Sequence, residues 1–230
     1  MSLEGNSIGS PGLQALSRAL KDNTELHELY LYNNQIDDFG MEEFGEMLSN
    51  KVNLFALGLE FNKIGSTGAA YVLNSVKKLK TFEKLYLNSN DIKGPAICDS
   101  LIDCLSQIEN LKELRLSNNK LGDEGGKALA AALRANKSVR ICHVSNNKLS
   151  AEAAKEFASL LEFKNTVLRD LDLSSNLIIM EELQILADAF KESSVECLNL
   201  RNNLISAEEI LAFDSVLAFV ANLPKRKFLF

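Results

Sequence analysis

One short pattern of leucines and asparagine repeats along nearly the whole sequence, and it constrains the fold more than any other feature. In its second copy the pattern reads Leu26-x-x-Leu29-x-Leu31-x-x-Asn34-x-Ile36. Successive pattern asparagines are 27 to 29 residues apart, a period typical of solenoids built from stacked copies of one unit. Seven copies are nearly full, and an eighth begins in mid-pattern at the N-terminus. The pattern asparagines are Asn6, Asn34, Asn62, Asn90, Asn119, Asn147, Asn176 and Asn203.

Each copy predicts a short strand, a turn and a helix. Leucines alternate with other residues in Leu29-x-Leu31, as in a strand with one buried face. Met41, Phe44 and Leu48 then follow helical spacing. One such unit cannot bury its apolar side alone, so neighbouring copies are expected to stack. The expected N-terminal helix caps are Ser10, Asp38, Ser66, Asp123 and Ser206, the last forming a capping box with Glu209.

The repeated asparagine has a physical explanation at the end of each strand. There the chain turns, and backbone groups lose their partners in a closely packed place. A short amide both donates and accepts hydrogen bonds, and each bond contributes about 1 kcal/mol net. We therefore expect the eight asparagines to form a stacked column that ties the turns together.

The pattern LxxLxLxxNxL, with a full helix in each copy, resembles the ribonuclease-inhibitor class of leucine-rich repeats. This resemblance implies an α/β fold and a single repeat domain over residues 1–230. It implies a right-handed, horseshoe-shaped solenoid with a parallel sheet on the concave side and helices on the convex side. Members of the class mostly bind proteins through the concave sheet face and the rising loops, the segments that lead from each strand to its helix.

Alternation along the strands places the residues between the inward leucines on the concave face. Tyr30 and Tyr86 are expected to flank a gap of about 10 Å over Gly58, because parallel strands lie about 4.8 Å apart. Exposed aromatic residues around a notch are typical of binding hot spots. The alternative is that the rings only cover a thin part of the sheet. The candidate partner-binding residues here are Tyr30, Tyr32, Gly58, Glu60, Phe61, Tyr86, Arg115, His143, Asp172 and Arg201.

A second candidate contact lies on the rising loop of the sixth copy. Leu177, Ile179 and Met180 stand where other copies carry polar or small residues, and Leu204 follows at the equivalent place in the next copy. An apolar spot on a loop is typical of a protein contact. The alternative is local packing that compensates for the missing Ser or Asp cap in this copy.

Several chemical functions find little support in the sequence. His143 beside Asp172, with Cys197 nearby, is better explained by a charge ladder across an open sheet than by a catalytic group. The segment GDEGGKA (122–128) lacks the spacing of a phosphate-binding loop. His27 and His143 are too far apart in the repeat order to share a metal. We predict no catalytic, cofactor or metal site.

The composition narrows the partners. Net charge is −6 with acidic and basic residues mixed, which argues against nucleic acid. The one tight basic run, PKRK (224–227), is interpreted as a solvated chain end. No apolar run approaches the length of a membrane helix, about 20 residues. Four cysteines do not make a disulfide framework, so we expect a cytoplasmic protein whose partner is another protein.

The two ends suggest a longer array. Phe228 lies 28 residues after Leu200, at the strand position of a further copy. The segment 208–223 is apolar on two helical faces, including Phe213 and Phe219. Either the final residues KFLF cover it, or the chain is a fragment of a longer array, and exposed ends could also pair with each other.

We predict a non-catalytic protein-interaction scaffold. The alternatives are a regulator of a small GTPase, by resemblance to Ran GTPase-activating protein, and a ligand-sensing array fragment of a NOD-like-receptor-type protein.

Overall fold

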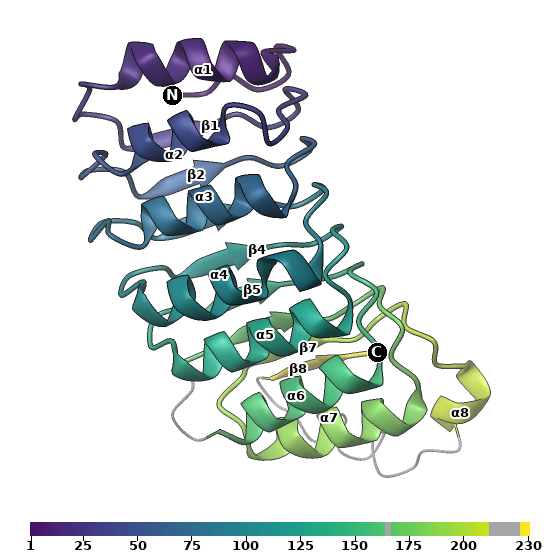
Figure 1. Ribbon diagram of the computed structural model, residues 1–230. Coiled ribbons are helices and arrows are strands. Elements are labelled where there is room, and N and C mark those ends of the chain that lie inside the picture. The colour runs from purple at the N-terminus through teal and green to yellow at the C-terminus, as the bar shows by residue number, and fades with distance from the viewer. Residues whose placement is uncertain (164–166, 212–225) are drawn as a thin grey trace.

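The computed structural model describes residues 1–163, 167–211 and 226–230. Eight parallel strands form one sheet in the order β1 to β8, each paired with its neighbours in the chain. Helices alternate with the strands and stack on one side of the sheet, and the array curves from one end to the other (Figure 1). This is the predicted right-handed β-α leucine-rich-repeat solenoid, with the strands on its concave side and the helices on its convex side.

The strands have three residues each, and the helices before α8 have eight to fourteen. The strands are β1 (Glu28–Tyr30), β2 (Ala56–Gly58), β3 (Lys84–Tyr86), β4 (Glu113–Arg115), β5 (Ile141–His143), β6 (Asp170–Asp172), β7 (Cys197–Asn199) and β8 (Lys227–Leu229). The helices are α1 (Gly9–Leu20), α2 (Met41–Leu48), α3 (Ser66–Val76), α4 (Gly94–Gln107), α5 (Gly122–Ala135), α6 (Ala151–Glu162), α7 (Met180–Glu192) and α8 (Ala207–Leu211).

The central residues of the strands form a continuous buried row. They are in register from β1 to β8 and face the helices, as the alternation predicted. Phe228 closes the row opposite Leu198 and packs against Phe190, with ring centroids 5.5 Å apart, so the predicted strand position of Phe228 is confirmed. The row is Leu29, Leu57, Leu85, Leu114, Cys142, Leu171, Leu198 and Phe228.

The asparagine column is confirmed. The Asn34 side-chain amide donates to the carbonyl oxygens of Leu3 (2.8 Å) and Leu31 (3.0 Å), one in the preceding copy and one in its own. Its Oδ1 accepts hydrogen bonds from the backbone N–H groups of Asn6 (2.9 Å) and Ile8 (3.3 Å). Each asparagine thus ties its own turn to the copy before it, and the same bonds recur as far as Asn203.

The predicted caps Asp38 and Asp123 are wrong as caps of their own helices. Asp38 Oδ1 accepts from the N–H groups of Gly65 (2.7 Å) and Gly68 (3.0 Å), so it caps α3 of the following copy. Asp123 caps α6 in the same way through Ser150 (2.7 Å). The carboxylates therefore link copies, which a pattern within one copy does not reveal.

The serine caps have mixed outcomes. Ser10 lies inside α1 and its hydroxyl donates to Asp37 (2.5 Å), while the Ser66 hydroxyl donates to the Lys93 carbonyl (2.9 Å), so both predictions are wrong. The capping box is confirmed, because the backbone N–H of Ser206 donates to Glu209 (2.8 Å) and that of Glu209 donates to the Ser206 hydroxyl (3.2 Å).

The C-terminal predictions are only partly tested. Phe213 and Phe219 lie outside the described residues. Arg226 of the basic run is not a solvated end: its Nε donates to the Val195 carbonyl (2.8 Å), and its guanidinium lies 3.9 Å from the Phe190 ring centroid. Among the described helices, none combines the length and apolarity that crossing a bilayer requires.

Candidate protein-binding surface

The concave face presents side chains in rows that run across the strands. The first residues of the strands form a first row and the third residues form a second row, which holds six of the ten contact residues predicted on this face. Those side chains point away from the buried leucines, as predicted. In register, the second row is Tyr30, Gly58, Tyr86, Arg115, His143, Asp172, Asn199 and Leu229.

The predicted open gap between Tyr30 and Tyr86 is wrong. The Tyr30 ring leans across to β2, where a Cβ added to Gly58 would meet Tyr30 Cδ1 at 2.7 Å and Glu60 Oε2 at 3.0 Å. Glycine is therefore needed at 58 because the ring and the carboxylate share the space above it. The position of Tyr30 agrees with the alternative given above, in which the ring covers a thin part of the sheet.

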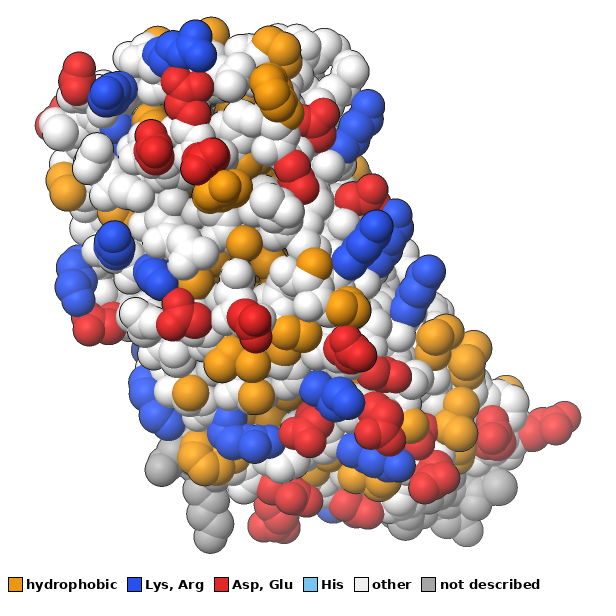
Figure 2. All heavy atoms as spheres, viewed as in Figure 1, with side chains coloured by type: hydrophobic (Ala, Val, Ile, Leu, Met, Phe, Trp, Pro, Cys, Tyr) orange, Lys and Arg blue, Asp and Glu red, His pale blue; other side chains and the backbone are white. Residues whose placement is uncertain are grey.

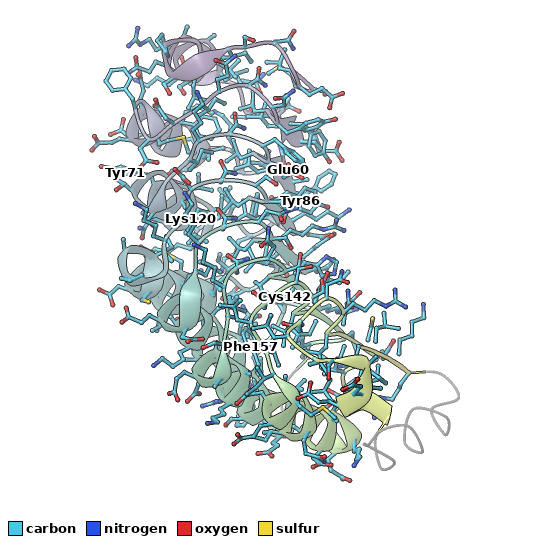
Figure 3. The ribbon with its side chains drawn as sticks, turned by 90° about the vertical axis from the view of Figure 1, so that its right-hand side faces the viewer. Glu60, Tyr71, Tyr86, Lys120, Cys142 and Phe157 are labelled. Carbon is cyan, nitrogen blue, oxygen red and sulfur yellow. The ribbon has the colours of Figure 1, made fainter. Side chains whose placement is uncertain are left out.

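Glu60 follows β2 and lies beside the Tyr30 ring. Its Oε2 is buried and has no hydrogen-bond partner among the described residues. Burial raises the pKa of the Glu60 carboxyl above its usual value. A buried polar atom without a partner costs about 1–3 kcal/mol, so this oxygen is a site that lacks a donor. Glu60 and Tyr86 lie together on the strand side of the array, whereas Tyr71 lies among the helices (Figure 3).

Tyr86, by contrast, belongs to a satisfied group. Its hydroxyl donates to Glu113 Oε2 (3.1 Å), and Arg115 Nε donates to Glu113 Oε1 (2.5 Å). The Arg115 guanidinium carbon is 5.3 Å from the Tyr86 ring centroid, within the range of a cation–π contact. Burial and the Glu113 carboxylate raise the pKa of Tyr86.

Phe61 has an unusual backbone. Its φ is +54°, a left-handed value that bulky residues rarely adopt, and its side chain is 62% exposed. An exposed aromatic residue held in a strained conformation is a functional candidate. Sequence reasoning named Phe61 but missed the strain, although the other copies carried a signal. The equivalent left-handed residues are all glycine, serine or asparagine: Gly5, Asn33, Ser89, Asn118, Asn146, Ser175 and Asn202.

The C-terminal half of the concave face is internally paired. His143 Nε2 lies 3.6 Å from Asp170 Oδ1, so its close partner is Asp170 and not its register neighbour Asp172. Asp172 Oδ1 accepts from the Ser174 N–H (2.9 Å). Burial and Asp170 raise the pKa of the Cys197 thiol to about 11, which keeps the thiol protonated and a poor nucleophile. No cluster of three or more candidate metal ligands occurs among the described residues.

The rising loops of the sixth and seventh copies carry the predicted apolar residues. Leu177, Ile179 and Leu204 are 44%, 46% and 58% exposed. Met180 differs from the expectation, because as the first residue of α7 it is partly buried against the core. The Ile179 N–H donates to the Glu182 carboxylate (3.3 Å), so Glu182 satisfies the start of α7 and the exposed side chains are not needed there. Figure 2 shows hydrophobic side chains together at the edge of the molecule beside α8.

Two further candidates, Arg201 and Tyr32, lie at the margin of the face. Arg201 is exposed beyond β7, and its backbone N–H donates to Asn199 Oδ1 (3.3 Å). Tyr32 is half-buried after β1. The structure thus brings Tyr30, Glu60 and Tyr86 together and leaves Arg201 far along the sheet, six strands from β1.

Comparison with known proteins agrees with this architecture. Residues 107–130 match a family model described as Leucine Rich repeat. The chain is 31% identical over 181 residues to the ribonuclease inhibitor of Sus scrofa, covering 77% of this chain and 39% of that protein. It is 30% identical over 139 residues to NACHT, LRR and PYD domains-containing protein 12 of Homo sapiens, covering 58% and 13%.

A third relative is the protein phosphatase 1 regulatory subunit 37 homolog of Caenorhabditis briggsae. Identity is 28% over 121 residues, covering 50% of this chain and 13% of that protein. The chain therefore spans 39% or less of the length of these three relatives. Together with the eight-stranded parallel sheet and the asparagine column, the matches show that the chain is a β-α leucine-rich-repeat solenoid whose repeats are similar to those of ribonuclease inhibitor.

Proposed function

We propose that this chain is a non-catalytic scaffold that holds a partner protein against its concave sheet face. The observation that carries the proposal is the Tyr30 ring beside the buried, unpartnered carboxylate oxygen of Glu60, on a face that also holds Tyr86 and the exposed Phe61. Aromatic side chains dominate binding hot spots because they bury a large area with few rotatable bonds. The sheet beneath them is fixed by its ladder and by the asparagine column, so little order would be lost on binding.

The relatives support a binding role. One is named as an inhibitor of ribonuclease and another as a regulatory subunit of a phosphatase, so both names describe proteins that act on other proteins. We carry this to the present chain only as a protein-binding role, since the chain spans a minor part of each relative.

The exposed Leu177, Ile179 and Leu204 form a second proposed contact, at the edge of the same array. These side chains leave the core and serve no cap, as described above. A partner that spans the concave face from β1 to the rising loops of the sixth and seventh copies would cover both regions.

The same geometry argues against catalysis. The Cys197 thiol is protonated near neutral pH, His143 is engaged by Asp170, and both lie on an open face. The four cysteines are free, which supports the proposal of a reducing, cytoplasmic location. Fractionation of cells, with detection of the endogenous protein, tests that location.

The test of the scaffold uses a double variant, Tyr30→Ala with Tyr86→Ala, and a matched control, Tyr71→Ala on α3. Each immobilised protein is incubated with cell extract, and the captured proteins are quantified by mass spectrometry. We expect a partner that the wild type and the control retain and that the double variant loses. If the captured proteins are the same for all three forms, the concave face is not the binding surface.

A second candidate function is ligand sensing within a larger receptor, which the match to the NACHT, LRR and PYD domains-containing protein favours. The structure of the full-length gene tests it. Regulation of a small GTPase has weaker support, because Arg115 is already held by Glu113. Stimulated GTP hydrolysis in a panel of GTPases tests that alternative.

A further inference from the structure

The concave face contains an acceptor with no donor. Among the described residues, two buried side-chain atoms lack a hydrogen-bond partner: Glu60 Oε2 and Arg134 Nε. Arg134 lies on α5 on the convex side, where its Nη2 donates to Glu156 and Ser159. Glu60 is therefore the unsatisfied group on the proposed binding face, and what it lacks is a hydrogen-bond donor.

Carboxylates act on the Tyr30 ring beside this acceptor, and the positive charge that acts on Glu60 is that of Arg115, which is hydrogen-bonded to Glu113 and not to Glu60 Oε2. After burial, the carboxylates of Glu28, Glu60 and Glu113 raise the pKa of Tyr30. Within the described part of the chain, neither Glu28 nor Glu60 forms an ion pair. Lys84, the nearest basic residue in the row of Glu28, is separated from it by Ala56. The missing donor is therefore expected to carry positive charge.

The neighbouring strands show what such a donor looks like. The guanidinium of Arg115 is hydrogen-bonded to Glu113 and lies within cation–π range of Tyr86. Tyr30 and Glu60 repeat this pairing of a tyrosine ring with a carboxylate, two strands away, but no cation among the described residues is hydrogen-bonded to Glu60 Oε2. The group of Tyr86 and Glu113 thus has its guanidinium, whereas the group of Tyr30 and Glu60 has the same ring and carboxylate and lacks one.

We propose that Tyr30 and Glu60 receive the guanidinium of an arginine side chain from the partner protein, with Phe61 covering it at the rim. This inference rests on the proposed scaffold function. Arginine fits better than lysine because its planar fork binds a carboxylate through two parallel bonds and stacks on an aromatic ring.

The probe is a short blocked peptide, acetyl-Gly-Arg-Gly-amide, and its matched control replaces arginine with citrulline, which is neutral and of nearly the same shape. Binding is followed by tyrosine fluorescence, because the chain has four tyrosines and no tryptophan. Three of the four, Tyr30, Tyr32 and Tyr86, lie on this face. We expect a saturable response to the arginine peptide and at least tenfold weaker binding of the citrulline peptide.

Two variants locate the effect. Glu60→Gln keeps the shape and removes the charge, so we expect it to abolish the preference for arginine over citrulline. Asp172→Asn removes a carboxylate from the same face, three strands beyond Tyr86, and is expected to keep the preference. Circular dichroism confirms that each variant is folded.

The outcomes separate this inference from the scaffold proposal. Equal binding of the two peptides, no saturable response at tens of millimolar, or an unchanged preference in Glu60→Gln overturns the arginine site. If the captured partner is lost in the double tyrosine variant while the arginine site fails, the scaffold function stands alone. If the double tyrosine variant still captures its partner, the scaffold proposal falls irrespective of the peptides.

Discussion

The two halves of the concave face share one backbone but differ in how their polar groups are satisfied. In the C-terminal half His143 lies against Asp170, and Asp172 accepts a hydrogen bond from the Ser174 N–H, so both carboxylates have partners within the chain. In the N-terminal half the Tyr30 ring lies beside Glu60, whose buried Oε2 has no hydrogen-bond partner among the described residues. A surface whose polar groups are already paired gains few new hydrogen bonds when a partner protein covers it. A surface with an unpaired acceptor beside exposed rings gains a bond when it is covered.

The largest effect on the free energy of unfolding is expected in the asparagine column, which both halves of the array share. Asn147 is fully buried, and its amide donates to the carbonyl oxygens of Leu116 (2.9 Å) and Val144 (3.2 Å). Asn147→Ala removes both bonds and leaves the Leu121 N–H without its acceptor, while the two carbonyl oxygens keep the bonds that Asn119 and Asn176 donate. Because three hydrogen bonds are lost, we expect the free energy of unfolding to fall by about 3 kcal/mol. Urea denaturation measures it.

The control for that prediction is Asn6→Ala. Asn6 is exposed at the end of the column, and its side chain donates within its own turn, to the carbonyl oxygens of Leu3 and Glu4. A loss of less than about 0.5 kcal/mol is expected there. Equal losses at Asn6 and Asn147 would contradict the idea that the column works by linking copies.

The second prediction compares the affinity for the partner after valine is introduced into each half of the concave face. Gly58→Val forces the Tyr30 ring and the Glu60 carboxylate apart, because even a Cβ would approach Tyr30 Cδ1 to 2.7 Å. Affinity for the captured partner is expected to fall about tenfold or more, equivalent to about 1.4 kcal/mol. Asn199→Val, in the same row on β7, is the matched control and is expected to change affinity less than about twofold. Surface plasmon resonance compares them.

The third prediction concerns stability in the N-terminal half. Because the pKa of Glu60 is raised in the folded state, the folded chain binds more protons than the unfolded chain above the usual value of 4.5. Stability therefore falls as pH rises through the folded pKa, and the ionised carboxylate opposes folding at neutral pH. Glu60→Gln is expected to raise the free energy of unfolding by about 1 kcal/mol at neutral pH. A loss of stability would show that Glu60 is satisfied within the chain.

Much of the architecture could be predicted from sequence because each copy reports the same constraint. Leu29 and its equivalents recur in register, and the asparagine column follows from a single spacing. The caps failed for an instructive reason. Asp38 and Asp123 lie near the starts of their own helices in the sequence, yet their carboxylates bind the helix of the next copy. Contacts between copies are long-range, and a local motif does not specify them.

The candidate surface was predictable by residue but not by geometry. Alternation placed Tyr30 and Tyr86 on the concave face, but it did not give the direction in which the Tyr30 ring leans, which depends on the missing Cβ at Gly58. The unpartnered oxygen of Glu60 could not be predicted either, because the sequence of one copy does not show that a ring from the neighbouring copy buries it. The left-handed Phe61 did have a signal, since glycine, serine or asparagine occupies its place in the other copies.

The smallest effect on the free energy of unfolding is expected in the C-terminal half, and its sign is opposite to that expected for Glu60→Gln. The hydrogen bond from His143 holds the pKa of Asp170 below its usual value of 3.8. The stabilisation is present above that value and is lost as pH falls through the lower, folded pKa. Asp170 is more than a third exposed, so solvent screening reduces the effect, and Asp170→Asn is expected to lower the free energy of unfolding by about 0.5 kcal/mol at neutral pH. Thermal denaturation of Asp170→Asn and Glu60→Gln side by side tests the sign. If both variants shifted stability in the same direction, the two halves would not differ in how their carboxylates are satisfied, and the N-terminal half would lose its distinction as the unpaired one.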